Sequence, residues 1–308
     1  MRTIVIGLGV QGKKRAAVAG AEVIGTVDPV QPEATYKTVT DVSLGGYDAA
    51  LVCTPDDTKV ELLSYLLGHG KHVLVEKPLV ASNNADIGRL LDLARARGVT
   101  CYTAYNHRLE PHFIRMKQLI DSGELARIYR CRMFYGNGTA RDVRDSPWRD
   151  KGAGVLVDLG SHLLDTVLFW FGPVDHEFRV VSRHRFENAA FDHVVLGAEG
   201  MPVLELEVTL LSWRNRFTCD VLAERGSAHI ESLCKWGPST FTRRRRRLPS
   251  GRPDEESVTL VQPDPTWTLE WEHFKQLCRR AESNLSNDLW LNQRLNALTA
   301  AALAGGRE

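Results

Sequence analysis

Short apolar runs alternate with stretches of helical composition over the first third of the chain. The runs have the length and composition of strands that are buried on both faces of a sheet. They lie at Thr3 to Ile6, Glu22 to Val27, Tyr47 to Cys53, Lys71 to Val75 and Thr100 to Ala104. Helices are expected between them, at Lys13 to Ala19, from a cap at Asp57 or Thr58 to about His69, and at Ser82 to Arg97. This alternation predicts a doubly wound parallel sheet.

The second strand is followed by a segment that is too short for the usual helix and strand. Pro29 and Pro32 favour a loop, and we expect one short strand at Tyr36 to Val39 before Asp41. The helix that would normally follow the second strand of a doubly wound sheet is therefore shortened in this chain.

The pattern changes after about His107, where strand-like runs follow one another with few helices between them. A helix is expected at Pro111 to Ser122, followed by a long strand at Arg127 to Asn137. Further strand-like runs lie at Glu177 to Phe186, His193 to Ala198, Val203 to Trp213, Phe217 to Ala223 and Ser227 to Leu233. Short turns between several of them predict an antiparallel meander. Other helices are expected at Gly154 to Phe171, Thr266 to Glu282 and Ser286 to Leu303.

The chain of 308 residues is long for a single core, so we predict two domains. Residues 1–106 are expected to form an α/β Rossmann domain with a doubly wound parallel sheet. Residues 107–308 are expected to form an α+β domain with a mainly antiparallel sheet.

A glycine-rich turn stands where the first apolar run gives way to the first helix. Its residues are Gly7, Leu8, Gly9, Val10, Gln11 and Gly12. The first glycine permits a sharp turn, the second lets the backbone approach a pyrophosphate, and the third lets helix and strand pack closely. A nucleotide-type fold that binds no nucleotide has the same turn. The register of strand, helix, second strand and a following acid favours cofactor binding.

That acid is Asp28, which follows the second strand and is placed to accept hydrogen bonds from the adenosine ribose. A carboxylate repels a 2′-phosphate, and Pro29 and Val30 offer no cation to it. We therefore expect NAD as the cofactor and NADP as the less favoured one, although Lys37 lies near enough in sequence to soften the preference.

Ligands of doubly wound sheets lie beyond the carboxyl ends of the strands. The residues that follow the other strands are therefore expected to face the same crevice. They are Thr54 and Pro55, then Glu76, Lys77 and Pro78, and finally Asn106, His107 and Arg108. We predict that Thr54, Pro55, Glu76, Lys77 and Asn106 contact the cofactor.

The composition argues against several classes of protein. Hydrophobic residues make up 43% and charged residues 25% of the chain, and 39 basic against 38 acidic side chains leave a formal net charge of +1. These values are ordinary for a globular protein and give no attraction to nucleic acid or membrane surfaces. No apolar run reaches the ~18–20 residues of a bilayer span. We also expect no signal peptide, because the first strand begins at once.

The 6 cysteines are scattered without paired spacing. This distribution is typical of reduced thiols in a cytoplasmic protein and not of a disulfide framework or a metal site. We expect no metal.

The helix at Gly154 to Phe171 carries polar groups on an otherwise apolar element. Asp158 and His162 are four residues apart and share one helical face, and Asp165 lies on much the same side. A buried carboxylate and a buried imidazole are both costly unless they are partnered. A structural Asp–His pair that holds two domains together and a catalytic pair both fit this spacing.

Several of these motifs occur together. They are the glycine turn, Cys53-Thr54-Pro55, Glu76-Lys77-Pro78, and Gly152-Ala153-Gly154 followed by Asp158, Gly160, His162 and Asp165. In this combination the chain resembles the Gfo/Idh/MocA oxidoreductase family, which includes glucose–fructose oxidoreductase and inositol 2-dehydrogenase, over nearly its whole length. The resemblance implies a Rossmann domain joined to an open-faced antiparallel sheet that binds substrate and builds the oligomer. It also implies hydride transfer between NAD or NADP and a secondary alcohol or ketone of a sugar, nucleotide-sugar or inositol.

By the same resemblance, Lys77, Asp158 and His162 take the catalytic positions of the family. The imidazole suits removal and return of a hydroxyl proton, and the ammonium favours alkoxide character on the substrate. Asp158 would orient the imidazole or hold a neighbouring hydroxyl. Trp148 and Arg149 match a Trp-Arg pair that lies beside the cofactor in many members.

The chain departs from the family pattern at a few places. Many members have three consecutive glycines where this chain has Gly152-Ala153-Gly154. Lys59 stands where many members have a histidine. Asp165 is expected to be structural or to orient the substrate. We expect His107 and His112 at the rim of the crevice.

The most basic stretch is Arg243 to Arg247. Alternate residues of a strand point to opposite faces, and Asp254 to Glu256 follow closely enough to pair with the arginines. We favour a solvated hairpin edge; an oligomer contact, a site for a substrate phosphate and a nucleic-acid site are the alternatives. Trp267 and Trp271 are expected to pack in the core and not to stack on a sugar.

The leading hypothesis is an NAD-dependent dehydrogenase or reductase with a polyol or sugar substrate and no nucleic-acid or membrane partner. Two others stay open: transient oxidation followed by elimination or hydrolysis, and a non-catalytic dinucleotide sensor. An open sheet with a bare apolar face rarely stays uncovered, so we expect a homodimer or homotetramer.

Overall fold

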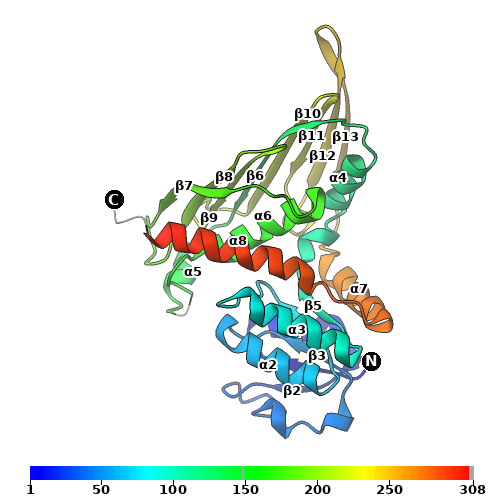
Figure 1. Ribbon diagram of the computed structural model, residues 1–308, viewed down its shortest axis with the longest axis vertical. Helices are drawn as coiled ribbons and strands as arrows, with labels where there is room; N and C mark the ends of the chain where they lie inside the picture. Colours follow the sequence, from blue (N-terminus) through cyan, green and yellow to red (C-terminus); the bar gives the residue numbers. More distant parts are fainter. Residues whose placement is uncertain (148, 305–308) are drawn as a thin grey trace. The chain divides into compact units, whose positions relative to one another are not determined.

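Five parallel strands, in the order β2-β1-β3-β4-β5, form the first sheet (Figure 1). They are β1 (Thr3–Ile6), β2 (Val23–Val27), β3 (Ala49–Val52), β4 (His72–Glu76) and β5 (Cys101–Ala104). The helices that connect them are α1 (Val10–Ala19), α2 (Asp56–Gly68) and α3 (Asn84–Arg97). All residues of β1, β3 and β5 are buried, as expected for a parallel sheet that is covered on both faces. The predicted doubly wound sheet is confirmed.

Two local predictions in this part are wrong. The expected strand at Tyr36 to Val39 is reduced to a single bridge between Tyr36 and Val27. Thr38 and Asp41 instead close a short 3₁₀ turn at Val39–Asp41 through a reciprocal capping box, which ends any strand. Helix α2 begins before the predicted caps, and Asp56 and Asp57 lie in its first turn, where carboxylates are stabilised by the helix dipole.

The second sheet has eight strands in the order β13-β12-β11-β10-β6-β9-β8-β7. They are β6 (Ile128–Gly136), β7 (Phe178–His184), β8 (His193–Ala198), β9 (Val203–Thr209), β10 (Arg216–Ala223), β11 (Gly226–Glu231), β12 (Ser239–Arg247) and β13 (Gly251–Leu260). Every neighbouring pair is antiparallel except β6 and β9. The predicted mainly antiparallel sheet is therefore confirmed.

One face of the second sheet is covered by α4 (Pro111–Asp121) and α6 (Val155–Phe171), which pack on β12 and on β6, β8 and β9. A shorter helix, α5 (Ala140–Arg144), lies between β6 and α6 in the sequence. Nearly all of α6 is buried, and alternate residues of β6, including Met133 and Tyr135, are buried with it. The candidate catalytic helix is thus the central element of this core.

The opposite face of the sheet is less apolar than the oligomer prediction assumed. Val181 and Val203 are exposed there, but Arg130 forms an ion pair with Glu205 at 2.6 Å and the His229 imidazole contacts Asp220 at 2.6 Å. A face that carries its own charge partners gives weaker support to association than a bare apolar one. A homodimer or homotetramer therefore stays a prediction.

The arginine run lies on β12, which pairs with β13 in an exposed hairpin. Arg244, Arg245 and Arg247 form ion pairs with Glu255, Glu256 and Asp254 of the facing strand, at 2.7, 3.3 and 2.5 Å. Arg243 pairs with Glu124 at 2.7 Å. Four of the five arginines thus pair with carboxylates of the chain, and Arg246 donates to the carbonyl oxygen of Glu224 at 3.2 Å, which agrees with the solvated hairpin edge.

The structure describes residues 1–147 and 149–304, and these divide into two compact units. The first contains Met1–Asn106 and Thr266–Gln293, and the second contains His107–Pro265 and the chain from Arg294. The predicted domains, 1–106 and 107–308, assign residues 266–293 to the second domain. In the structure these residues belong with the first sheet.

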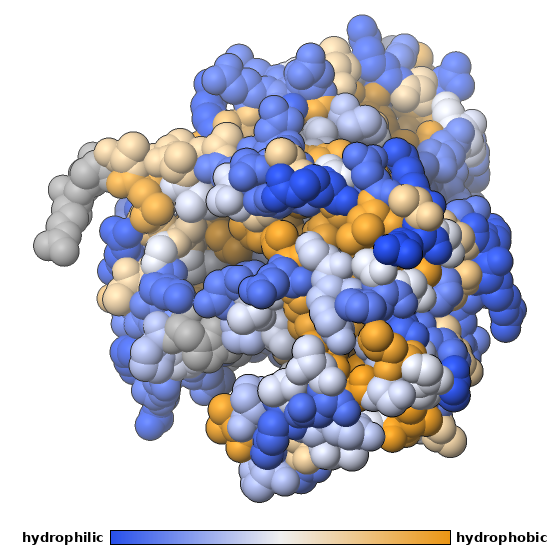
Figure 2. Space-filling view, turned by 60° about the horizontal axis from the view of Figure 1, so that its bottom comes forward, coloured by the Kyte–Doolittle hydropathy of each residue, from blue (hydrophilic) through white to orange (hydrophobic). Residues whose placement is uncertain are grey.

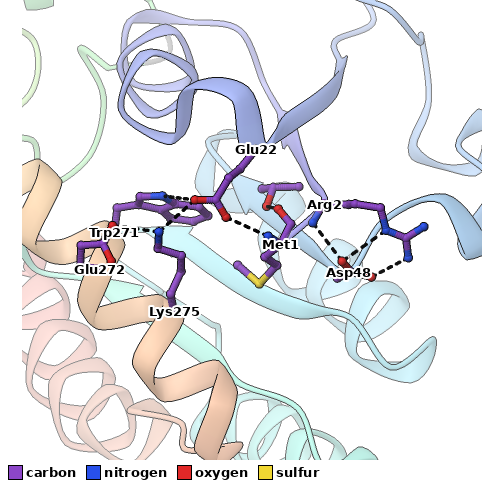
Figure 3. Close-up of polar contacts among 8 residues, drawn as sticks. Met1, Arg2, Glu22, Asp48, Trp271, Glu272 and Lys275 are labelled. Carbon is purple, nitrogen blue, oxygen red and sulfur yellow. Dashed lines mark hydrogen bonds and ion pairs between the residues drawn. The ribbon is translucent and has the colours of Figure 1, made fainter.

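Two helices, α7 (Thr266–Arg280) and α8 (Leu285–Ala304), supply this returning segment. Trp271 and Lys275 of α7 both donate hydrogen bonds to Glu22, at 3.3 and 2.9 Å (Figure 3). The Asn284 side chain bonds both backbone groups of Thr103 on the edge strand β5, at 2.8 and 2.9 Å. These contacts explain why the segment packs on the first sheet, and the buried Trp271 confirms the expected core packing of that residue.

Charged and apolar residues are interspersed on the face shown in Figure 2.

None of the described helices is long and apolar enough to cross a membrane.

Candidate functional site

The first and third glycines of the turn are required by the fold itself. Gly7 has φ +90°, and a Cβ there would lie 2.6 Å from the carbonyl oxygen of Cys53. A Cβ on Gly12 would lie 1.8 Å from the carbonyl oxygen of Gly7. Both distances are shorter than any van der Waals contact, so the turn closes only with glycine at these positions.

Gly9 is different, because a Cβ built on it meets no protein atom within 4 Å. It is the N-cap residue of α1, and among the described residues no side chain caps this helix and no acid lies in its first turn. The open side of Gly9 and the N–H groups that follow form a site for an anionic group that approaches the backbone closely. This is the geometry that a pyrophosphate needs.

Asp28 lies against the same turn. Its carboxylate accepts hydrogen bonds from the backbone N–H groups of Leu8 at 2.7 Å and of Val30 and Gln31 at 2.9 Å. Partial burial opposes ionisation, but these bonds and the nearby Lys37 ammonium outweigh it and hold the pKa of Asp28 below its usual value. Asp28 is therefore an anion at neutral pH. The glycine turn and this carboxylate fit the pyrophosphate and ribose of a dinucleotide.

The other predicted cofactor residues follow β3 and β5 at the carboxyl edge of the sheet. Thr54 accepts a hydrogen bond from the Thr58 hydroxyl at 3.0 Å, and Pro55 precedes α2. The Asn106 amide donates to the Thr266 hydroxyl at 2.8 Å and is buried. Their contacts with a cofactor stay predictions. Trp148 lies outside the described residues.

Glu76 at the end of β4 has a clear structural partner. Its carboxylate accepts a hydrogen bond at 2.7 Å from Arg15 of α1, and Arg15 also pairs with the fully buried Glu270 of α7 at 2.7 Å. Trp267 stacks on the Arg15 guanidinium, with 4.3 Å between the guanidinium carbon and the ring centre. A cofactor contact by Glu76 remains a prediction, whereas its role in holding α1 against β4 is visible.

This buried network changes the protonation of Glu270. Burial is the larger effect and raises the pKa of Glu270 to about 7, although Arg15 favours the charged form. Burial alone would lower the pKa of Arg15, but the two carboxylates outweigh it and raise that pKa. Arg15 is therefore always charged.

In the second unit, His162 lies on α6 and is buried. Its ring stacks on His107 with 4.0 Å between the ring centres, and it forms a T-shaped contact with Tyr135 at 5.8 Å. The Lys235 ammonium lies 3.5 Å from His107 and 3.4 Å from the Tyr135 hydroxyl. The candidate base is thus held by aromatic rings within a polar cluster.

Asp158 lies in the first turn of α6 with its side chain 41% exposed, and its carboxylate is 3.8 Å from the Arg149 guanidinium. Burial of Tyr135 is the main reason that its pKa is raised, and Asp158 adds to this effect. Asp158 is therefore electrostatically coupled to the cluster around His162. Arg149 and Asp158, which the sequence assigned separately, form one charged pair.

Asp165 has a structural role. It accepts three hydrogen bonds from Arg108, at 2.7 to 3.1 Å, and is almost fully buried. Burial raises the pKa of Asp165, and Arg108 opposes this shift. The pair fixes α6 to the segment before α4.

The expected rim position of His107 and His112 is wrong, since both are buried. His112 contacts the carbonyl oxygen of Ser239 at 3.0 Å, whereas His107 belongs to the cluster with His162. The sequence did not indicate Tyr135 or Lys235 either. The alternating buried pattern of β6 indicates that Tyr135 faces the core, but nothing local in the sequence relates it to α6.

No group of three or more His, Cys, Asp or Glu side chains among the described residues is arranged to hold a metal ion.

Two family models match the chain. A model described as an oxidoreductase family with an NAD-binding Rossmann fold matches residues 1–105, and one described as the GFO/IDH/MocA C-terminal domain matches residues 113–229. These ranges together cover more than half of the chain. The protein therefore belongs to the Gfo/Idh/MocA oxidoreductase family, and its first unit contains the family's NAD-binding domain.

Similar proteins carry oxidoreductase names. An uncharacterized oxidoreductase of Escherichia coli is 31% identical over 218 residues, which is 67% of this chain and 62% of that protein. A scyllo-inositol 2-dehydrogenase (NADP(+)) of Bacillus subtilis is 33% identical over 155 residues, which is 48% of this chain and 42% of that protein. The chain spans about half the length of the curated relatives it matches.

A solved levoglucosan dehydrogenase in complex with NADH has the same fold, with a TM-score of 0.82 at 17% identity, covering 98% of this chain and 96% of that one.

The two kinds of glycine in the turn predict different outcomes for the same substitution. Gly12→Ala should prevent the turn from closing, and we expect a clear loss of thermal stability together with loss of NAD binding. Gly9→Ala should fold with a wild-type melting temperature, because its Cβ meets no protein atom. It should nevertheless bind NAD at least about tenfold more weakly, since the methyl group occupies the space of the pyrophosphate. Fluorescence titration with NADH and a thermal melt distinguish the two; wild-type affinity in Gly9→Ala would contradict this assignment.

The buried network predicts a pH dependence of stability. A carboxyl whose folded pKa lies above its unfolded value binds a proton on folding, so its contribution to stability is present at low pH and is lost as pH rises through the folded pKa. For Glu270 this window extends from about 4.5 to about 7. Glu270→Gln removes the titration, so between these pH values the wild type should lose stability relative to the variant. Urea unfolding of both proteins at several pH values measures the difference; parallel pH profiles would contradict the assignment.

Proposed function

We propose that this protein is an NAD-dependent oxidoreductase that transfers hydride between the nicotinamide and a secondary alcohol or ketone of a sugar, nucleotide-sugar or inositol. The observation that carries the proposal is the pairing of a dinucleotide turn with an ionised Asp28 in one unit and a buried, stacked His162 in the other. The names of two similar proteins, a scyllo-inositol 2-dehydrogenase and a levoglucosan dehydrogenase, support polyhydroxylated rings as the substrate class.

His162 is assigned the proton step. Bound NAD supplies the ring that accepts the hydride. The substrate hydroxyl must give up its proton as the hydride leaves, and an imidazole has a suitable intrinsic pKa for accepting and returning that proton near neutral pH. Stacking on His107 restricts the orientation of the His162 ring. A base held in one orientation is more effective than a mobile one.

Lys77 is assigned the electrostatic step. Its ammonium would lie against the substrate oxygen and stabilise the negative charge that develops as the proton leaves. Asp158 would hold a neighbouring hydroxyl, and the Arg149 guanidinium lies 3.8 Å from its carboxylate. We propose that these groups act on one substrate molecule together with His162.

NAD is favoured over NADP because of Asp28. Its carboxylate is fixed by three backbone N–H groups and remains charged, so a 2′-phosphate would be repelled. The nearby Lys37 ammonium donates to the carbonyl oxygen of Gln31 at 2.9 Å, which limits its help to a phosphate. An oligomer and a cytoplasmic location complete the proposal as expectations from the sequence.

A substrate screen tests the reaction. NADH absorbance is followed with sugars, inositols and nucleotide-sugars, with NAD and NADP in parallel, and we expect turnover of at least one polyol with NAD as the better cofactor. Glycoside cleavage without net NADH would instead identify transient oxidation. NADH binding without turnover of any class would favour a sensor.

Lys77→Met and His162→Gln should each lower kcat by about 10²–10⁴-fold while NADH still binds, because each removes a group that acts on the reacting oxygen. Steady-state kinetics and NADH titration measure both quantities. Lys71→Met and His229→Gln serve as matched controls away from the proposed chemistry and should keep wild-type kcat. Full activity in both Lys77→Met and His162→Gln would contradict the proposal.

A further inference from the structure

Lys59 is a buried lysine for which the proposed reaction has no use. It lies in the first turn of α2, only 1% of the residue is exposed, and its side chain points away from solvent into the first unit. A buried ammonium is costly unless all three of its N–H donors find acceptors. The groups that accept hydrogen bonds from the Lys59 ammonium therefore indicate the role of this buried lysine.

Two of the three acceptors belong to one short segment at the end of β4. The Lys59 ammonium donates to the carbonyl oxygen of Glu76 at 2.6 Å and to that of Pro78 at 2.9 Å. The third bond goes to the Asp56 carboxylate at 2.6 Å. The two carbonyl groups belong to the residues immediately before and after Lys77. One ammonium therefore fixes the backbone on both sides of the candidate catalytic lysine.

The same segment is also held from its other side. The Glu76 side chain is bound by Arg15, while its carbonyl oxygen is bound by Lys59. Charge-assisted hydrogen bonds in a low-dielectric interior are stronger and shorter than neutral ones. The backbone at Lys77 is consequently fixed by two buried cations, and a shift of the segment would break bonds to both.

We propose that Lys59 is a positioning residue that sets the backbone beneath Lys77, so that the Lys77 ammonium meets the substrate oxygen in the correct place. This inference rests on the proposed function of Lys77. Misplacement of a catalytic group by about 1 Å can cost ~10²-fold in rate without affecting ground-state binding elsewhere. Loss of the Lys59 bonds should therefore lower kcat and leave intact the parts of the cofactor site at the glycine turn and Asp28.

Lys59→Met tests the proposal because it keeps the length of the side chain and removes all three donors. We expect kcat per NADH-binding site to fall about 10–100-fold, with NADH affinity within about threefold of wild type. The double variant Lys59→Met/Lys77→Met should be no slower than Lys77→Met alone, since a positioning residue has no effect once the group it positions is absent.

Lys71→Met is the matched control. The Lys71 ammonium also donates to two backbone carbonyl groups of the first unit, those of Leu44 at 2.5 Å and Tyr47 at 2.8 Å, but neither flanks Lys77. A merely structural role of such a lysine would lower thermal stability in both variants and leave kcat per NADH-binding site unchanged. A drop in kcat confined to Lys59→Met supports positioning.

Three results would overturn the inference: wild-type kcat in Lys59→Met when Lys77→Met is inactive, an equal loss of kcat in Lys71→Met, or a further loss in the double variant. If Lys59→Met does not fold, Lys59→Gln is measured in its place, with the same expectations, because its amide bonds at most part of the same acceptors. The Lys77→Met variant distinguishes failure of the proposed function from failure of this inference. Full activity of Lys77→Met would show that Lys77 has no catalytic role, independently of the result for Lys59→Met.

Discussion

A single buried guanidinium connects the parts of the first unit on which cofactor binding and chemistry depend. Arg15 extends from the helix of the glycine turn to Glu76 at the end of β4 and to Glu270 of the returning helix α7. An arginine without access to water requires carboxylate partners, and removal of one partner from such a network is far more costly than the net stability of the pair. The helix that would receive the pyrophosphate and the strand that leads to Lys77 are therefore fixed to each other.

Steric and hydrogen-bond constraints also position the other residues of the candidate cofactor site in the first unit. Gly7 and Gly12 let the turn close, Gly9 leaves space in front of the helix, and Asp28 is fixed by the N–H group of Leu8. Lys59 fixes the carbonyl groups around Lys77 from the opposite side to Arg15. In the first unit, the buried cations Arg15 and Lys59 both bind groups of Glu76, next to Lys77.

The second unit supplies a different environment. Its helix α6 is almost entirely buried, so the polar residues that it carries need partners, and each has one: Arg108 for Asp165, Arg149 for Asp158, and the stacked His107 ring for His162. An imidazole whose orientation is restricted by aromatic rings suits a group that must accept and return a proton. On α6 the candidate base His162 lies between two charged pairs, those of Asp158 and Asp165, within an otherwise apolar core.

Much of the fold was predictable because its signals are local. The apolar runs, the glycine turn and the acid after β2 determine a parallel sheet and a dinucleotide site from short stretches of sequence, and the embedded helix indicated Asp158 and His162. The residues that were missed depend on contacts between distant parts of the chain. Glu270 meets Arg15 only because α7 returns to the first sheet, and Tyr135 meets His162 only because β6 lies under α6. The strand expected at Tyr36 was wrong because a capping box at Thr38 competes with it.

The proposed reaction requires an ammonium and an imidazole from different units to act on the same oxygen atom. The most direct measurement is a crystal structure of the protein with NADH and a bound polyol. We predict that one substrate hydroxyl lies within hydrogen-bond reach, about 3 Å, of both the Lys77 ammonium and a His162 ring nitrogen, with its carbon facing the nicotinamide. A complex in which the bound hydroxyl contacts neither group, or in which the two groups contact different parts of the ligand, would contradict it.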